Sequence, residues 1–175
     1  MNTNLDYFKQ QSERLTYRKL TPDDIPKWIA FFINNDRLHF LGMDETKTKE
    51  SLASDWISMQ FKRYEEINLG HLAVERKEDG MFIGLCGILP RELDGKREFE
   101  IAYSLIPTFW KQGYGTEMAT QMKQFATKNI DTERFISIIH IDNIDSMNVA
   151  KKNGMIVLFR TEFMGMIVDV YGSDK

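Results

Sequence analysis

Two Asp-Gly dipeptides in the middle of the chain constrain its fold more than any other feature. Asp79-Gly80 separates the strand-like runs His71–Arg76 and Met81–Leu89, and Asp94-Gly95 stands before a further run, Phe99–Ile106. Asp-Gly between such runs is a strong hairpin signal, because both residues tolerate the positive φ that a two-residue turn needs. The sequence therefore predicts three consecutive antiparallel strands.

Hydrophobic periodicity predicts further elements on both sides of these strands. Additional strands are expected at Arg14–Leu20, Phe135–Ile141, Val157–Phe163 and Met166–Tyr171, the last two as a hairpin around Gly165. Helices are expected from Thr21 through Phe32, from Thr48 to Tyr64, from Tyr114 through Ala126 and from Ile144 to Lys152. The predicted fold class is therefore α/β (α+β), with helices flanking a mixed, mostly antiparallel sheet of about seven strands. A single domain is expected to span residues 1–175.

Composition argues against several classes of protein. The chain of 175 residues has a net charge of −3, so it lacks the basic field with which proteins hold nucleic acid. No apolar stretch approaches the ~20 residues of a membrane span, and the N-terminus lacks the apolar run of a secretory signal. The single cysteine, Cys86, suits a reducing compartment and is expected to pack inside a strand. We expect a cytoplasmic protein without nucleic-acid or membrane partners.

One segment has the pattern of a phosphate-binding loop. A strand ending near Pro107 leads into Trp-Lys-Gln-Gly-Tyr-Gly, residues 110–115, and then into an amphipathic helix. The N–H groups at the start of a helix favour a pyrophosphate, and glycine lets the ligand approach the backbone. The third glycine of a dinucleotide fingerprint is replaced by Met118, and the lysine of a P-loop is missing. A plain strand-to-helix turn remains the alternative interpretation.

In its wider context this segment resembles the GNAT superfamily of N-acetyltransferases. Pro107–Glu117 is similar to the superfamily's acetyl-CoA pyrophosphate loop, and Asn143–Met155 is similar to its later cofactor-binding helix. Glu13–Asp24 resembles the opening strand and turn, so the matches cover nearly the whole chain. Trp110 and Ser146, with the ending Gly165…Asp-Val-Tyr, resemble the branch that acetylates the N-termini of ribosomal proteins and related amines.

The resemblance implies a GNAT fold, acetyl-CoA as cosubstrate without a metal, and a set of cofactor-binding residues. The backbone N–H of Leu105 would stabilise negative charge developing on the thioester oxygen. The three histidines show no metal-ligand spacing. The implied cofactor-binding residues are Tyr103, Ser104, Leu105, Trp110, Lys111, Gln112, Gly113, Tyr114, Gly115, Thr116, Asn143 and Ser146.

Three further side chains have proposed roles with open alternatives. Glu100 is the candidate general base for the amine, and its alternative is a solvated charge, with Glu98 and Glu162 as rivals. Ser146 would protonate or hydrogen-bond the leaving thiolate, or it is an idle helix residue. Asn143 would contact the cofactor, or it caps the helix that starts at the next residue.

The implied activity is transfer of acetyl to a primary amine, either a protein N-terminus or a small amine, by direct attack in a ternary complex. The sequence departs from the family pattern at Ala150, where many members carry a tyrosine proposed as general acid, and at Met155, where phenylalanine is commoner. A non-catalytic acyl-CoA sensor is therefore the first alternative, and a dinucleotide-dependent oxidoreductase is the second. Oligomeric state stays open, with a homodimer common among such families.

Overall fold

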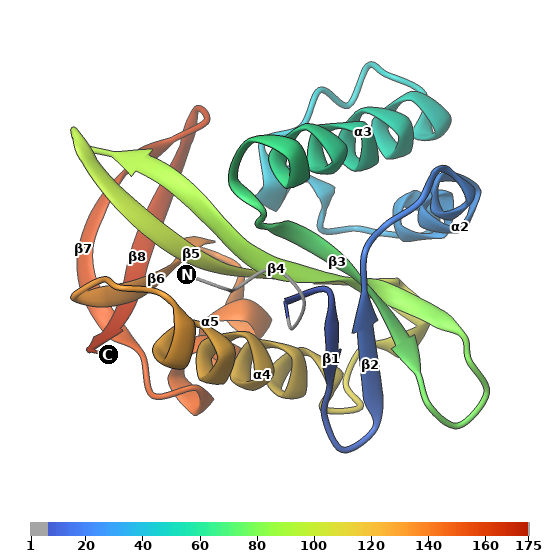
Figure 1. The fold of residues 1–175 in the computed structure, drawn as a ribbon. Coiled ribbons are helices and arrows are strands. Elements are labelled where there is room, and N and C mark those ends of the chain that lie inside the picture. Colours follow the sequence, from blue (N-terminus) through green and yellow to red (C-terminus); the bar gives the residue numbers. More distant parts are fainter. Residues whose placement is uncertain (1–6, 175) are drawn as a thin grey trace.

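The computed structural model describes residues 7–174, which form one mixed sheet with helices on both faces. Eight strands lie in the order β1-β2-β3-β4-β5-β6-β8-β7, and every neighbouring pair is antiparallel except β5 and β6 (Figure 1). The strands are β1 Lys9–Gln11, β2 Leu15–Arg18, β3 Gly70–Arg76, β4 Phe82–Leu93, β5 Lys96–Leu105, β6 Arg134–His140, β7 Ile156–Phe163 and β8 Met166–Asp174.

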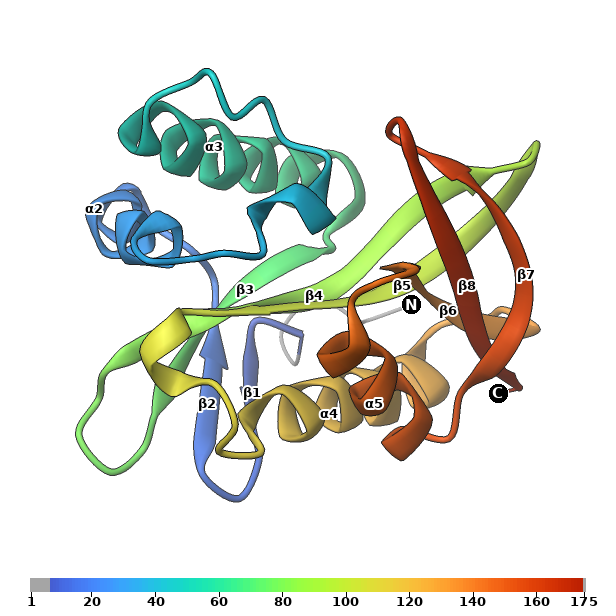
Figure 2. The same cartoon turned by 180° about the vertical axis from the view of Figure 1, so that it is seen from behind.

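The helices divide between the two faces of the sheet. In Figure 1 α2 and α3 lie above the sheet and α4 and α5 lie below it, and Figure 2 shows the same layers from behind. The α-helices are α2 Ile25–Trp28, α3 Lys49–Ile67, α4 Tyr114–Asn129 and α5 Ile144–Lys152. Short 3-10 segments are η1 Pro22–Asp24, η2 Ile29–Phe32, η3 Leu38–Leu41 and η4 Pro107–Phe109. Within residues 7–174, no helix is both long and apolar enough to cross a membrane.

The predicted mixed, mostly antiparallel sheet is confirmed, and each predicted strand and helix has a counterpart. Strand β1 is additional, because its sequence Lys-Gln-Gln carries no apolar alternation. It is held by pairing with β2 and by buried Gln10, which accepts a hydrogen bond from Gln121. The predicted helix after Thr21 starts there but divides into η1, α2 and η2. Pro26 lies inside this stretch and lacks the N–H of a continuous helical ladder.

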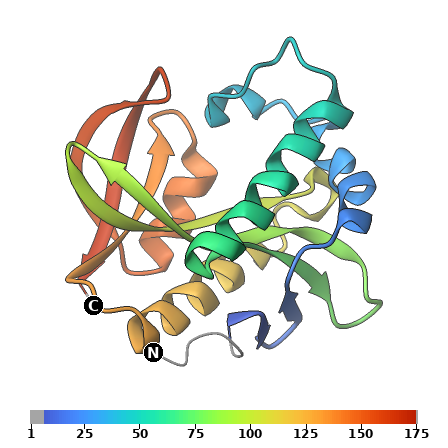
Figure 3. The same cartoon turned by 45° about the horizontal axis from the view of Figure 1, so that its top comes forward.

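The two Asp-Gly dipeptides make different turns. Asp94 and Gly95 both have positive φ, 50° and 74°, and the β4–β5 hairpin closes in two residues, as its sequence predicts. In the β3–β4 hairpin only Gly80 has positive φ, because Arg76 bonds to Met81 around a four-residue loop. The β4–β5 hairpin rises beside the β7–β8 hairpin on the side of the sheet that faces α3 (Figure 3).

Strands β5 and β6 pair over a very short length. Their parallel register contains the single pair Glu100↔Ile136, although both strands continue beyond it. Hydrogen bonding on that side of β5 ends where the hydroxyl of Ser137 donates to the carbonyl of Ile101 at 2.8 Å. The last residues of β5 are therefore paired with β4 alone, which leaves a gap in the sheet near its centre.

Candidate active site

At the end of β5, backbone N–H and C=O groups point into the gap between β5 and β6. Leu105 lies opposite Gly84 in β4, and the next N–H, that of Ile106, donates to Ile83 at 3.0 Å. This pattern makes Leu105–Gly84 a pair without direct mutual hydrogen bonds, so the N–H and C=O of Leu105 point away from β4. Backbone groups alternate in direction along a strand, so the N–H and C=O of Tyr103, two residues before Leu105, also point away from β4. The structure thus places the backbone of both predicted residues toward the gap.

The loop after β5 has the conformation of an anion-binding turn. Lys111 and Gly113 take positive φ of 60° and 82°, and α4 starts at Tyr114 with no side chain capping its first turn. The first helical hydrogen bond runs from the N–H of Glu117 to the carbonyl of Gly113. The N–H groups of the three residues before Glu117 have no partner within the helix, and the helix dipole adds positive potential there. This geometry suits a phosphate.

Glu117 anchors the loop to the β1–β2 turn. Its carboxylate accepts hydrogen bonds from the Ser12 hydroxyl at 2.6 Å and from the backbone N–H of Arg14 at 2.7 Å. The Arg14 side chain donates to the same carboxylate and to the carbonyl of Gln112. Burial acts to raise the pKa of Glu117, but these hydrogen bonds outweigh it and lower the pKa overall. The anchor therefore stays ionised near neutral pH and fixes the start of α4.

A cavity of about 280 Å³ lies between this loop, the end of β5 and α5, and we call it the loop cavity. Gln112 is the one predicted cofactor-binding residue that does not line it. Its side chain donates instead to the carbonyl of Thr108. The predicted residues that line the loop cavity are Tyr103, Ser104, Leu105, Trp110, Lys111, Gly113, Tyr114, Gly115, Thr116, Asn143 and Ser146.

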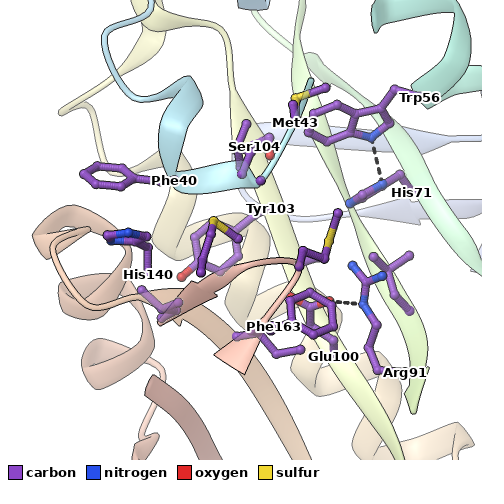
Figure 4. A pocket seen from close by; sticks show the side chains of 18 of the residues that line it. Phe40, Met43, Trp56, His71, Arg91, Glu100, Tyr103, Ser104, His140 and Phe163 are labelled. Atoms are coloured by element: carbon purple, nitrogen blue, oxygen red, sulfur yellow. Dashed lines mark hydrogen bonds and ion pairs between the residues drawn. The ribbon is translucent and has the colours of Figure 1, made fainter. Parts of the chain in front are cut away.

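A second cavity, of about 460 Å³, lies between α3, η3 and the β7–β8 hairpin, and we call it the hairpin cavity (Figure 4). Its walls are largely apolar and include Met43, Trp56 and Phe163. Both cavities reach six shared residues, namely Phe40, Leu41, Tyr103, Ser104, Asn143 and Ser146. The two cavities therefore meet at the end of β5, one from each side.

Residues from β5, α5, β6 and η3 lie at or beside this junction. The Tyr103 hydroxyl donates to the carbonyl of Ser146 at 3.0 Å, which holds α5 against β5. Asn143 accepts from the N–H of Ser146 at 3.2 Å, so it caps α5 as its alternative interpretation predicts while also lining both cavities. His140, at the end of β6, packs beside Phe40 with ring centroids 4.9 Å apart.

Glu100 lines the hairpin cavity and is not a solvated charge. It is buried, and Arg91 Nε lies 2.6 Å from its Oε2 atom (Figure 4). The rival Glu98 pairs with Arg134 and lines neither cavity. Glu162 is exposed on β7 and also lies outside both. Glu100 is thus the one of the three predicted bases that faces a cavity.

Two histidines line the hairpin cavity, and no sequence motif predicts either of them as a site residue. His71 is 5% exposed, and its Nδ1 accepts a hydrogen bond of 3.2 Å from Trp56 Nε1. Burial first, and then the nearby Arg63 and Arg91, lower the pKa of His71 to about 3, so its ring is neutral. His140 accepts a hydrogen bond of 3.1 Å at Nδ1 from the N–H of Asp142. Tertiary packing brings both rings to the cavity.

Cys86 is buried in β4 and lines neither of the two cavities. Burial raises the pKa of the Cys86 thiol well above its usual range, because the side chain is enclosed in β4. The predicted packing role agrees with this burial, since reactive thiols need an accessible, electropositive setting. Among residues 7–174, no group of three or more His, Cys, Asp or Glu side chains is arranged to hold a metal ion.

A family model and a curated relative each match most of this chain. The model of the acetyltransferase (GNAT) domain family matches residues 14–156. The N-acetyltransferase YoaA of Bacillus subtilis, itself uncharacterized, is 24% identical over 144 residues, which are 82% of this chain and 80% of YoaA.

Solved structures share the fold at lower identity. An acetyltransferase from Agrobacterium tumefaciens superposes with a TM-score of 0.77 at 22% identity, covering 95% of this chain and 94% of its own. RimL, described as a ribosomal L7/L12 α-N-protein acetyltransferase in complex with coenzyme A, superposes with a TM-score of 0.73 at 16% identity. That match covers 93% of this chain and 95% of RimL.

Proposed function

The chain belongs to the GNAT acetyltransferase family, and we propose that it transfers the acetyl group of acetyl-CoA to the nitrogen of a primary amine. The acceptor is a protein N-terminus or a small amine, and transfer occurs by direct attack within a ternary complex. The observation that carries this proposal is the meeting of two cavities at Tyr103, Ser104, Asn143 and Ser146. Donor and acceptor can enter from opposite sides of β5 and meet at its end.

The residues of the loop cavity fit acetyl-CoA. The positive φ of Gly113 and the open first turn of α4 offer N–H groups to a pyrophosphate, and Lys111 and Lys152 add positive charge at the same cavity. The outward-facing backbone groups of Tyr103 offer strand-like hydrogen bonds to the amides of the pantetheine arm. When bound, acetyl-CoA supplies an acyl carbon activated as a thioester.

The Leu105 N–H is the donor placed for charge stabilisation. It points into the gap, and Trp110 Nε1 holds the carbonyl of the same residue at 2.9 Å. A fixed donor aimed at a developing oxyanion contributes about 3–4 kcal/mol of transition-state stabilisation in the best-studied case. A covalent acetyl-enzyme is not part of the proposal, because buried Cys86 has a raised thiol pKa and no activated serine is evident.

Proton transfer is assigned to Glu100 and Ser146. The attacking amine must be neutral, so it loses one proton during the reaction while the departing thiolate gains one. Glu100 lines the cavity on the acceptor side and would take the first proton through a chain of water molecules, because it lies four strand residues before Ser104. Ser146 lines both cavities, and its hydroxyl would protonate the thiolate, or hydrogen-bond it while water supplies the proton.

One observation favours the alternative of an acyl-CoA sensor without turnover. Arg91 holds Glu100 in an ion pair, which occupies one of the two carboxylate oxygens that would accept the proton. Ala150 is also buried, and its side chain offers no acid. Both interpretations require acetyl-CoA binding, and they separate only when turnover with an amine is measured.

Thermal unfolding with ligands tests the part of the proposal that both interpretations share. Acetyl-CoA and CoA should raise the melting temperature, since ligand at ~100 times its Kd adds about 2.7 kcal/mol of stability. NAD and ATP should give no comparable shift. An unchanged melting temperature at millimolar acetyl-CoA would remove the acetyl-CoA function, and a shift with NAD alone would revive the oxidoreductase alternative.

A further inference from the structure

We propose that the amine acceptor carries a carboxylate, which Arg63, Arg91 and His71 bind in the hairpin cavity. This inference rests on the proposed acetyl transfer and adds the chemical class of the acceptor. We call the part of the hairpin cavity lined by Arg63, Arg91, His71 and Glu100 the arginine end. Its charges are unbalanced, and its polar groups are mainly donors.

Arg63 is the cation without a counter-ion. It projects from α3, is partly buried and lines the hairpin cavity, where its Nη1 donates to Gln60 Oε1 at 3.2 Å. Throughout residues 7–174, no carboxylate lies within ion-pair distance of its guanidinium. Burial and the neighbouring Arg91 lower the pKa of Arg63, and Glu100, beyond ion-pair distance, only partly opposes them. A guanidinium nevertheless keeps its charge in proteins. A partly desolvated cation of this kind favours an anion from outside the chain.

Arg91 is only partly neutralised by its neighbour. The ion pair with Glu100 joins Arg91 Nε to one carboxylate oxygen and leaves the two terminal nitrogens of the guanidinium outside that bond. Arg91 Cζ also lies 5.4 Å from the centre of the Phe163 ring. Two guanidinium groups and one carboxylate therefore share the arginine end, which carries a net positive charge. Three further charged groups line the cavity outside the arginine end. Lys47 and Asp55 pair with each other at 3.0 Å, and Asp44 accepts hydrogen bonds from Thr46.

His71 adds a neutral donor to the two cations. The indole N–H of Trp56 can only donate, so the atom that accepts it, His71 Nδ1, carries no proton. Since the ring is neutral, its proton lies on Nε2. No described residue forms a hydrogen bond with that atom, and the ring lines the cavity beside Trp56 (Figure 4). The arginine end thus offers an unused N–H together with guanidinium forks.

These donors and the apolar walls define the ligand. A carboxylate matches the planar fork of a guanidinium and accepts a further hydrogen bond from an imidazole. Glu100 lies four strand residues from Ser104, about 13 Å along β5, and the arginine side chains shorten that span. The carboxylate and the reacting amine are therefore separated by an apolar chain of several bonds. An ω-amino acid or a short apolar peptide with a free C-terminus meets this description.

Matched acceptors test the proposal through turnover. The probes are 8-aminooctanoate, 8-aminooctanamide and the ω-aminoalkyl phosphonate of equal length, compared by kcat/KM from hydrolysis-corrected thiol release. We expect the acid to exceed the amide by about 10- to 100-fold, the range of a charge-assisted hydrogen bond. Equal values for acid and amide would overturn the proposal. A phosphonate preferred more than tenfold over the carboxylate would overturn the assignment to carboxylates.

Substitution of Arg63 tests whether the preference for the acid over the amide arises at the arginine end. In Arg63→Gln the ratio of acid to amide should fall toward one, and in Arg63→Lys part of it should remain. Lys62→Gln removes one positive charge from the neighbouring, exposed position of α3, outside the cavity, and should leave the ratio at its wild-type value. An unchanged ratio in Arg63→Gln, or an equal loss in Lys62→Gln, would contradict the site.

A binding measurement keeps this inference separate from the activity. If no amine is acetylated, the proposed transfer fails, but calorimetric titration with the N-acetylated acid and amide still reports on the arginine end. Binding of the acid at least tenfold tighter than the amide, lost in Arg63→Gln, supports the carboxylate site without turnover. Equal binding of the two would overturn it.

Discussion

The indole Nε1 of Trp110 donates a hydrogen bond of 2.9 Å to the carbonyl of Leu105, and this contact joins the loop before α4 to the last residue of β5. The N–H and C=O of Leu105 face the same side of the strand, so holding the carbonyl also fixes the direction of the N–H. The outer face of the indole is covered by Arg37, whose Cζ lies 4.1 Å from the ring centre. In the proposed mechanism, this bond would couple cofactor binding to charge stabilisation.

Trp110→Phe tests that coupling. The substitution keeps an aromatic ring for Arg37 but removes the donor, so Leu105 is free to reorient. We expect kcat/KM for acetyl-CoA to fall about 3- to 10-fold, as expected for one neutral hydrogen bond. Steady-state kinetics with a fixed amine measure this, and Trp110→Ala, which also loses the stacking, should fall further. Wild-type kinetics in Trp110→Phe would show that the bond is not used.

Gly115 is predicted to leave room for acetyl-CoA in the loop cavity, because it has no side chain. A Cβ at this position would lie 3.5 Å from Val149 Cγ2 and 3.8 Å from Leu105 Cδ1, which are ordinary contacts. Gly115→Ala should therefore bind acetyl-CoA nearly as well as wild type, whereas the two methyl groups of Gly115→Val would enter the loop cavity. We expect the Kd of Gly115→Val to rise more than tenfold, with circular dichroism unchanged. Unaltered affinity would place the phosphates elsewhere.

Local signals predicted most of the fold because strands and helices here carry their own periodicity and turns. The helix at Ile144–Lys152 and the turn at Asp94-Gly95 appear as the sequence indicates. Strand β1 and the divided helix around Pro26 depend on partners and on a missing N–H, which a hydrophobic pattern does not report. The gap beside β5 could not be predicted from sequence either, because it depends on how β5 pairs with β6, a strand far away in the chain.

The sequence predicted the part of the candidate site whose residues are adjacent in the chain. The loop from Trp110 to Thr116 could be located because its glycines and the following helix are neighbours along the chain. The hairpin cavity could not, since Arg63, His71 and Phe163 come from a helix and two different strands. Glu100 was predicted as a candidate base, but its ion pair with Arg91 depends on cross-strand packing and gave no sequence signal. Its catalytic role stays a prediction.

Glu100→Gln tests the assignment of the base. A general base contributes about 10²–10⁴ in rate, so turnover of a lysine-like amine with pKa ~10.4 should fall by that factor. The loss should be smaller for an α-amine near pKa ~8 and should shrink as the pH rises, because more of the acceptor is already neutral. Profiles of kcat/KM from pH 6 to 9 for both acceptors measure this. Equal profiles for variant and wild type would remove Glu100 from the mechanism.

His71 should make the fold sensitive to mild acid. Its pKa of about 3 in the folded protein lies below the ~6.5 of an unfolded histidine, so below pH ~6.5 the unfolded state binds a proton that the native state does not. Stability should therefore fall as the pH drops, by about 2 kcal/mol between pH 7 and pH 5. Urea unfolding at both pH values should show this loss in wild type and a much smaller one in His71→Gln. The same loss in both proteins would contradict a neutral, buried His71.

The central claim is that the two cavities bring acetyl-CoA and an amine together for transfer. Its most direct test is incubation of the purified protein with acetyl-CoA and a panel of amines and N-terminal peptides, followed by mass spectrometry of every acceptor. The account predicts one acetyl group on the nitrogen of at least one acceptor, with an equal amount of free CoA and no acetyl on the protein itself. Tight acetyl-CoA binding with no acetylated acceptor, or transfer only through an acetylated protein, would contradict it.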